Sequence, residues 1–179
     1  MIRAACLVLL LLLGACASVP ENPPRTVERV DLARYAGTWF EAARFPVRFQ
    51  DGPNLRCDAV TATYALRPDG QVGVRNACRN GLAEGRPERV ANGTAYVVEG
   101  SPNTRLRVSF FWPFYGDYWV IGLDPDYRWA VVGAPRRDYL WILSRTPQMA
   151  QADYDRAVAI AAREGFDTAR LQRTRHGSP

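Results

Sequence analysis

The sequence predicts an all-β fold: an eight-stranded antiparallel up-and-down barrel with one C-terminal α-helix packed on its side. Three observations across the 179 residues predict this fold. β-rich runs recur at regular spacing, short polar turns separate them, and one amphipathic helical pattern follows the last run. A meander of this kind closes into a barrel because closure removes the unpaired strand edges.

The chain begins with a pattern typical of an export signal. Arg3 supplies a positive charge, and residues 4–13 form an apolar stretch of ten residues. A bilayer span needs about 20 apolar residues, so this stretch suits a signal peptide instead. Residues 13–16, Leu-Gly-Ala-Cys, resemble the bacterial lipobox, whose cysteine receives a diacylglycerol and becomes the new N-terminus. The alternative is an ordinary secretory signal with a coincidental cysteine at position 16.

The domain organisation follows from this start. We expect a lipoprotein signal peptide over residues 1–15, a lipidated Cys16 with a Pro-rich linker over 16–25, and the folded domain over 26–179. Acyl chains anchor by burial, at about 0.8 kcal/mol per CH₂, so several chains hold far better than one. Ala17 replaces the aspartate that retains enterobacterial lipoproteins at the inner membrane. The sequence therefore predicts the outer membrane, with the domain in the periplasm.

Each predicted strand is rich in β-branched and aromatic residues and is bounded by turn residues. A short helical turn over 30–35 precedes the first strand, and the turn Arg-Pro-Asp-Gly over 67–70 joins the second strand to the third. Leu171 is expected to begin a last short strand. The eight strands are predicted at residues 37–45, 57–66, 71–78, 89–98, 105–112, 117–123, 129–134 and 139–144.

The helix follows the eighth strand. Thr146 is predicted as its N-cap and Pro147 as its first residue, while Gly165 at C′ and the hydrophobic Phe166 after it are predicted to end the helix. The apolar stripe between them is expected to pack against the barrel wall. Its members are Met149, Tyr154, Val158, Ile160 and Ala161.

The composition excludes several functional classes. All 23 basic residues are arginine, and His176 is the single histidine. The chain therefore lacks a lysine for a Schiff base or a P-loop, and it lacks histidines for a Ser-His-Asp triad, a zinc site or a haem. Accordingly, neither a metal nor a cofactor is predicted. The net charge of +5 is spread among 18 acidic residues, without a basic run, so no nucleic-acid partner is predicted.

Alternation along the strands predicts which side chains face the barrel interior. In the first strand, Glu41 shares a face with Trp39, and so do the two alternate residues that follow. A buried carboxylate such as Glu41 either signals function or is simply hydrogen-bonded in the barrel. The candidate inward residues of the first, fifth and eighth strands, beyond Trp39, are Glu41, Ala43, Phe45, Leu106, Val108, Phe110, Trp112, Tyr139, Trp141 and Leu143.

Three motifs occur in order along the domain. Residues 37–39 (GTW), residues 126–130 (DYRWA) and Arg145 at the end of YLWILSR resemble the three signature motifs of lipocalins. Pro125 and Trp129 stand where the second motif has threonine and tyrosine. The stretch FFWPFYGDYWVIGLDPDYRWAVV is especially similar to bacterial outer-membrane lipoprotein lipocalins, the apolipoprotein D-like members. The resemblance covers nearly the whole mature domain and implies the same barrel and helix.

The resemblance assigns structural roles to the motif residues. It implies that Trp39 plugs the closed end of the barrel and that Arg145 lies over its ring, a cation–π contact worth roughly 0.5–2 kcal/mol. Gly37 lets the chain turn tightly into the first strand. Asp126 and Tyr127 belong to the same barrel-closing set.

Cys57 and Cys78 remain after Cys6 leaves with the signal and Cys16 is acylated. They flank one predicted hairpin at similar distances from its turn, and export brings them into an oxidising compartment. A disulfide between neighbouring strands is therefore expected. The alternative is a free thiol, which would leave open a cysteine-dependent lipid-modifying enzyme that uses Cys57, Glu41 or a tyrosine.

The function predicted is the binding and storage or transport of a hydrophobic ligand, without catalysis. The resemblance implies fatty acids, lysophospholipids or similar lipids and a role in envelope maintenance or stress. Arg48 and Arg56 are candidates to face an anionic head group, with solvated loop arginines as the alternative. The candidates for the rim are aromatic residues, with simple packing as the alternative: Phe45, Phe49, Trp112, Phe114 and Tyr115. An interaction lipocalin that uses its exterior, including a homodimer built on Phe40 and Trp119, is a further alternative.

Overall fold

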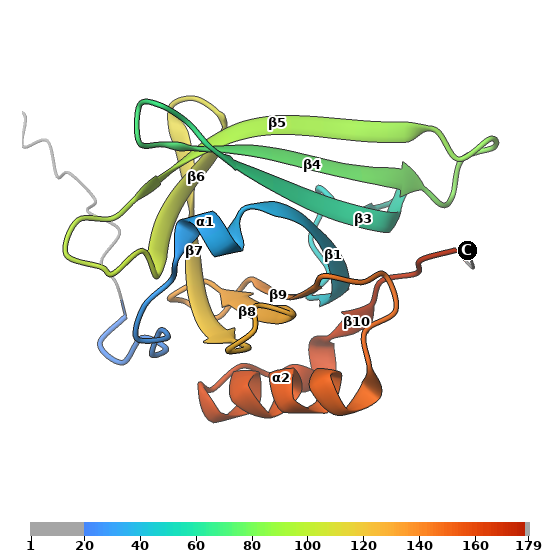
Figure 1. Cartoon of the computed structure of the whole chain (residues 1–179). Coiled ribbons are helices and arrows are strands. Elements are labelled where there is room, and N and C mark those ends of the chain that lie inside the picture. The colour runs from blue at the N-terminus through green and yellow to red at the C-terminus, as the bar shows by residue number, and fades with distance from the viewer. Residues whose placement is uncertain (1–19, 178–179) are drawn as a thin grey trace, which may run out of the picture.

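The computed structural model describes residues 20–177, so the predicted signal peptide and Cys16 lie outside the described residues. Eight long strands form one antiparallel meander that closes because β1 pairs with both β9 and β3 (Figure 1). The predicted eight-stranded barrel is confirmed. Its strands are β1 (Gly37–Arg44), β3 (Leu55–Leu66), β4 (Val72–Asn80), β5 (Glu88–Val97), β6 (Arg105–Phe111), β7 (Phe114–Leu123), β8 (Trp129–Gly133) and β9 (Leu140–Ser144).

The remaining elements of the described chain are two helices, a 3₁₀ helix and two short strands that flank this barrel. The helix α2 packs outside β7 and β8, and the chain then returns along β1 (Figure 1). The predicted C-terminal helix and last short strand are thus present, although that strand begins one residue after Leu171. These elements are α1 (Leu32–Tyr35), β2 (Asp51–Gly52), α2 (Gln151–Arg163), η1 (Thr168–Arg170) and β10 (Gln172–Arg173).

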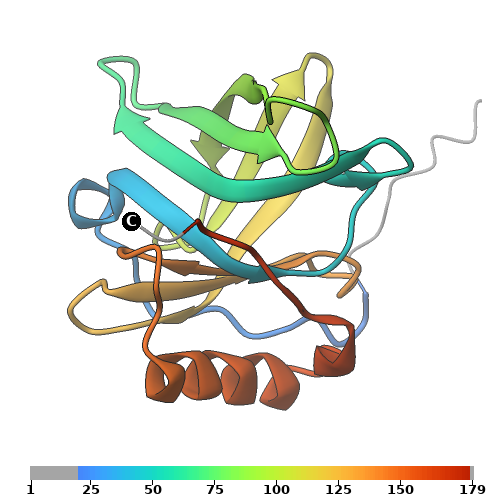
Figure 2. The same cartoon turned by 90° about the vertical axis from the view of Figure 1, so that its right-hand side faces the viewer.

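The two ends of the barrel differ. Figure 2 shows the helix α1 crossing the end on the left, and we call this end closed; we call the other end open. The closed end carries the turns over 67–71, 98–104 and 124–128. The open end carries the loop over 45–54 and the turns over 81–87, 112–113 and 134–139.

Two large apolar clusters hold most of the domain together, and a third, smaller one surrounds Cys57 and Cys78. The inner cluster fills the barrel and includes Trp39, Tyr64, Leu106 and Val120. The outer cluster lies between the barrel wall and α2. Its members include Phe45, Trp119, Ile121, Trp129, Val131, Leu140, Ile142, Ala157, Ala161 and Phe166. Because successive strand residues point to opposite faces, β7, β8 and β9 are apolar on both sides.

The ends of α2 confirm one prediction and correct another. Gly165 has φ +84°, its N–H donates to Ala162, and the N–H of Phe166 donates to Ala161, as a Schellman ending requires. The predicted N-cap Thr146 is wrong, because the N-cap is Ala150 and makes no side-chain cap bond. The Thr146 hydroxyl donates to the carbonyl of Gln148 instead, which holds a turn between β9 and the helix.

A bulge in β1 overturns the predicted inward placement of Ala43 and Phe45. Glu41 pairs with Leu143 and Ala43 pairs with Ile142, so Ala42 is an extra residue. An extra residue exchanges the two faces of the strand beyond it. Ala43 and Phe45 consequently lie in the outer cluster beneath α2, where Phe45 packs against Phe166.

The barrel wall parts between β5 and β6 in its open half. β5 pairs with β6 only from Thr94 to Val97, whereas it pairs with β4 from Glu88 to Ala95. In Figure 1, β4 and β5 continue together to the right while β6 turns upward. Ala91 lies on the inward register of β5 and is exposed, so solvent reaches this part of the strand's inner face.

The end of the predicted linker is packed against the domain. Pro24 is fully buried, and the backbone N–H of Arg25 donates to Glu164 at 2.8 Å. The folded unit therefore starts before residue 26. Between residues 20 and 177, no helix is long and apolar enough to cross a membrane.

Candidate functional site

The interior of the barrel is apolar and narrow. A cavity of about 20 Å³ remains near its closed end, lined entirely by apolar surface that includes Val30, Leu106 and Val120. This volume holds about one water molecule. An acyl chain therefore requires side chains nearer the open end to move aside.

Three tyrosines place neutral hydroxyls inside the barrel beside this cavity. The hydroxyl of Tyr118 lies 2.8 Å from that of Tyr35 and 3.0 Å from that of Tyr64. Burial raises the pKa of Tyr64 to about 12 and raises the pKa values of Tyr35 and Tyr118 further above their usual range. All three stay uncharged at physiological pH, so the base of the barrel carries no charge that would repel an apolar ligand.

The closed end is organised around Trp39. Its side chain is fully buried, and Nε1 donates to the carbonyl of Tyr35 at 2.8 Å. The Arg145 guanidinium lies 3.8 Å from the ring centroid and donates to the carbonyls of Thr38 and Arg34. Gly37 has φ +90°, and a Cβ there would lie 3.5 Å from Arg145 Nη1. Only glycine adopts this conformation readily beside the arginine.

The second motif contributes differently from its prediction. Asp126 is exposed, whereas the buried Asp124 accepts bonds from the backbone N–H groups of Asp126 and Arg128 and from the Arg128 guanidinium. These bonds to Arg128 hold the pKa of Asp124 below its usual range. Tyr127 accepts a bond from the N–H of Asp31 and thereby ties the turn to the segment before α1. The role of Asp124 was not predicted from the sequence, although it is the first residue of the Asp-Pro-Asp run over 124–126.

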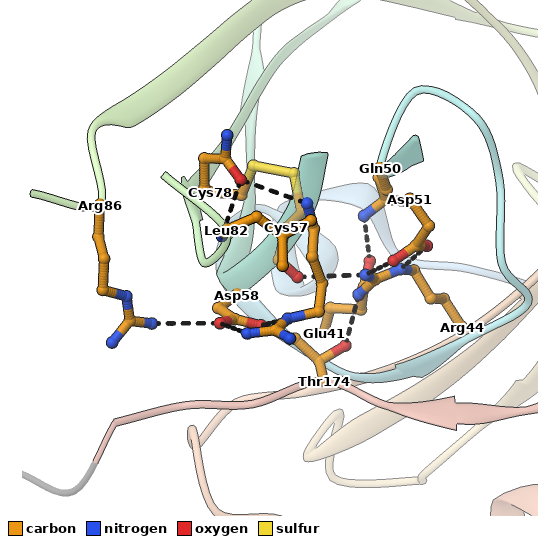
Figure 3. Close-up of a disulfide and its surroundings, with 12 residues drawn as sticks. Glu41, Arg44, Gln50, Asp51, Cys57, Asp58, Cys78, Leu82, Arg86 and Thr174 are labelled. Atoms are coloured by element: carbon orange, nitrogen blue, oxygen red, sulfur yellow. Dashed lines mark hydrogen bonds and ion pairs between the residues drawn. A yellow bond between two sulfur atoms is a disulfide. The ribbon is translucent and has the colours of Figure 1, made fainter. Parts of the chain in front are cut away.

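A buried ionic network lies at the open half of the barrel (Figure 3). Arg44 donates to Glu41 at 2.6 Å, to both carboxylate oxygens of Asp51 and to the carbonyl of Cys57. Burial opposes the charge of Arg44, but the bonds to Asp51 and the charge of Glu41 outweigh it and raise the pKa of Arg44. The network joins β1, the loop over 45–54 and β3.

Gln50 extends this network towards the lumen. Its amide nitrogen donates to Glu41 at 2.7 Å, and its amide oxygen accepts from Trp141 Nε1 at 3.1 Å. Glu41 also accepts from Thr174 of the C-terminal segment. The predicted inward position of Glu41 is thus correct, and its oxygens are occupied by structural partners. Sequence reasoning missed Arg44 and Asp51, because their pairing depends on the bulge and on the loop.

The structure joins Cys57 and Cys78 in a disulfide at the same end (Figure 3). A disulfide sulfur cannot act as the thiolate nucleophile that the enzyme alternative requires at Cys57. Among residues 20–177, no group of three or more His, Cys, Asp or Glu side chains is placed to hold a metal ion.

We expect the disulfide to stabilise the domain measurably. It closes a loop with a sequence separation of 21, for which chain entropy predicts about 3 kcal/mol. Cys57→Ser/Cys78→Ser should lower the free energy of unfolding in urea by this amount. The wild type in reducing agent should match the variant, and two titratable thiols in the native mature protein would contradict the bond.

Several of the remaining ligand candidates lie along the lumen or at its mouth. Val108, Tyr139 and Trp141 line the lumen or its mouth, with Tyr139 stacked between Phe49 and Trp141. Phe110 also lies at the mouth, because a Cβ on Gly93 would fall 2.8 Å from its ring. Their side chains form the wall that a ligand entering from the open end would meet first.

Three other predictions need correction. Arg56 is paired with Asp58 at 3.2 Å, so it is not free for a head group. Tyr115 lies near the open end but packs against Tyr96 on the outer face, so it does not line the lumen as a ligand contact. Trp112 lies at the exposed tip of the β6–β7 hairpin, outside the lumen.

One loop arginine is exposed at the open end, whereas the two aromatic residues predicted for a dimer surface are covered. Arg48 is exposed at the open end and forms none of the ion pairs found among the described residues. Trp119 is buried in the outer cluster, and Phe40 is covered edge-on by His176. Trp119 and Phe40 therefore do not form the exposed dimer surface that the sequence allowed.

Comparisons with known proteins agree with this geometry. A family model described as "Lipocalin-like domain" matches residues 30–176. "Outer membrane lipoprotein Blc" of Citrobacter freundii is 47% identical over 166 residues, which cover 89% of this chain and 88% of that protein. The chain belongs to the lipocalin family.

More distant lipocalins share the fold. Apolipoprotein D of Macaca fascicularis is 28% identical over 173 residues, covering 89% of this chain and 81% of that protein. The structure of insecticyanin from the tobacco hornworm, Manduca sexta, has a TM-score of 0.69 and 15% identity and covers 90% of this chain and 87% of that one. The resemblance inferred from the three motifs is confirmed, with the bacterial lipoprotein more similar than apolipoprotein D.

Proposed function

We propose that this protein is a lipid-anchored lipocalin that binds one hydrophobic ligand in its barrel and stores or carries it. The supporting observation is an apolar barrel interior whose wall parts between β5 and β6 in the open half. Burial of an acyl chain there contributes about 25 cal/mol per Å² of apolar surface. The family consists largely of binding proteins, and the relatives named as outer membrane lipoproteins support attachment to the same membrane.

The proposed ligand is a fatty acid, a lysophospholipid or a similar single-chain lipid. Its chain enters past Phe110, which rests against the inner face of Gly93, and extends towards the three tyrosine hydroxyls. The head group stays at the open end, where Arg48 is exposed. Arg44 is already saturated by carboxylates, so it does not serve as the head-group partner.

A blocked lumen tests this proposal. Ala95 is buried in the inner cluster, and Tyr96 follows it on the outer face of β5. Ala95→Trp should fill the space for the chain and weaken binding of a dansyl-labelled fatty acid by at least about tenfold, because the ligand's apolar contacts are lost. Tyr96→Trp adds the same indole on the outside and should bind like the wild type.

Equal binding by the two variants would contradict a site inside the barrel. Native mass spectrometry of the protein extracted gently from its own membrane gives the physiological ligand. One reproducible acyl ligand per chain is expected. An empty barrel without affinity for fatty acid or lysophospholipid would remove the proposal, as would lipid turnover that Cys57→Ser abolishes.

A further inference from the structure

Exposed apolar side chains gather at the open end of the barrel. Among residues 20–177, eleven large hydrophobic residues are prominently exposed, and eight of them lie on the loops or strand ends there. Large exposed apolar side chains that gather in one region of a protein often mark a site of protein or membrane interaction. We call these eight residues the aromatic rim: Phe49, Leu82, Phe110, Phe111, Trp112, Phe114, Tyr115 and Tyr139.

The tip of the β6–β7 hairpin forms the most prominent part of this rim. The uncharged run over 110–115 is FFWPFY, in which Phe111, Trp112 and Phe114 are 76%, 78% and 70% exposed. The rings of Phe111 and Phe114 stack at a centroid distance of 6.3 Å. Tryptophan, tyrosine and phenylalanine are the side chains that favour the boundary between water and hydrocarbon in membranes.

The described chain starts at the same end. The Arg137 guanidinium, in the open-end turn over 134–139, donates to the carbonyl of Asn22 at 3.0 Å and to the carbonyl of Glu164 at 2.7 Å. Figure 2 shows the blue start of the chain on the right, beside the orange turn over 134–139 and below the teal loop over 45–54. From there the chain runs back to α1 at the closed end.

This attachment limits how far the open end can lie from the membrane. Cys16, the expected lipid anchor, precedes Asn22 by six residues. Six extended residues span at most about 20 Å. An anchor of this length holds the open end close to the bilayer, whereas the closed end lies a barrel length further away.

We propose that the aromatic rim docks on the lipid bilayer to which the chain is anchored, with the hairpin tip in the head-group region. The short attachment favours the bilayer over a second copy of the chain as the occupant. The orientation directs the gap between β5 and β6 at the membrane, so a lipid passes between bilayer and barrel without crossing water. This inference rests on the proposed lipid binding and on the expected anchor at Cys16.

Tryptophan quenching tests the orientation. The lipidated protein is reconstituted into vesicles of phosphatidylethanolamine and phosphatidylglycerol that carry bromine on their acyl chains. Trp112 is far more exposed than Trp39, Trp119 and Trp129. Bromine should therefore quench part of the tryptophan emission of the wild type, and this quenched part should be missing in Trp112→Phe. The matched control adds Leu66→Trp, at an exposed position of the closed end, to Trp112→Phe and should show no added quenching.

A second variant separates docking from ligand binding. Phe111→Ser/Phe114→Ser should slow transfer of a dansyl-labelled fatty acid from these vesicles to the protein by about tenfold, because apolar contact with the bilayer is lost. Its equilibrium affinity for the same fatty acid in solution should stay unchanged. If the wild type itself showed no affinity for the fatty acid in solution, the proposed function would be wrong.

Two results would overturn the docking proposal. One is quenching at Leu66→Trp equal to that at Trp112. The other is that bromine does not quench Trp112, while Trp112 crosslinks to a second copy of the chain. In that case a concentration-dependent dimer should form, and Phe111→Ser/Phe114→Ser should abolish it. The second result would assign the rim to a homodimer.

Discussion

Trp39→Ala should lower the free energy of unfolding by about 3–5 kcal/mol, the usual cost of removing a large aromatic side chain from a core. Trp39 is fully buried at the closed end of the barrel, and its ring carries the Arg145 guanidinium at 3.8 Å. The substitution also removes the bond to the Tyr35 carbonyl and leaves Arg145 over a cavity. Urea denaturation followed by circular dichroism measures the loss.

Two comparisons separate packing from the cation–π contact. Trp112→Ala removes the same side chain from an exposed position and should change stability little. Arg145→Lys keeps the charge but loses the fork that reaches the carbonyls of Thr38 and Arg34, so it should also destabilise, by a smaller amount. If Trp39→Ala and Arg145→Lys both melted like the wild type while losing ligand, the barrel-closing role would be wrong.

Arg44→Met should cost about 3–5 kcal/mol, because it leaves two carboxylates at a largely buried site without their counter-charge. The Arg44 side chain is 4% exposed, and its partners Glu41 and Asp51 belong to different segments of the chain. The loop over 45–54 should also loosen, since Asp51 and Gln50 are its contacts with the network. Thermal melting and hydrogen exchange of this loop measure the two effects.

The matched control is Arg67→Met, which breaks an exposed pair with Asp69 and should cost less than about 1 kcal/mol. The triple variant Glu41→Gln/Arg44→Met/Asp51→Asn removes all three charges and should recover part of the loss. Equal melting temperatures for Arg44→Met and Arg67→Met would show that the buried pairing contributes nothing to stability.

Local patterns were sufficient to predict the barrel. Strand runs, polar turns and the C-terminal helix depend on propensity and alternation, which act within a few residues. The pairing of Cys57 with Cys78 was expected because hairpin geometry limits which strand positions meet. The closed end was predicted from three motifs, and the structure places Arg145 over Trp39 as the resemblance implied.

The candidate site was predicted less well, and each miss has a physical cause. The prediction of inward residues assumed that side chains alternate along an unbroken strand. The extra residue Ala42 therefore reversed the placement of Ala43 and Phe45. Thr146 satisfied the rules for an N-cap, but its hydroxyl holds the turn before the helix.

The sequence by itself determined the family, the strand order and the apolar character of the barrel, because these depend on spacing and on side-chain type. Only the tertiary structure decided which faces the side chains occupy beyond a bulge and which charges neutralise one another. It also decided that the start of the described chain and the aromatic rim share one end of the barrel. Asn22 and Arg137 are 115 positions apart in sequence, and only folding brings such residues into contact.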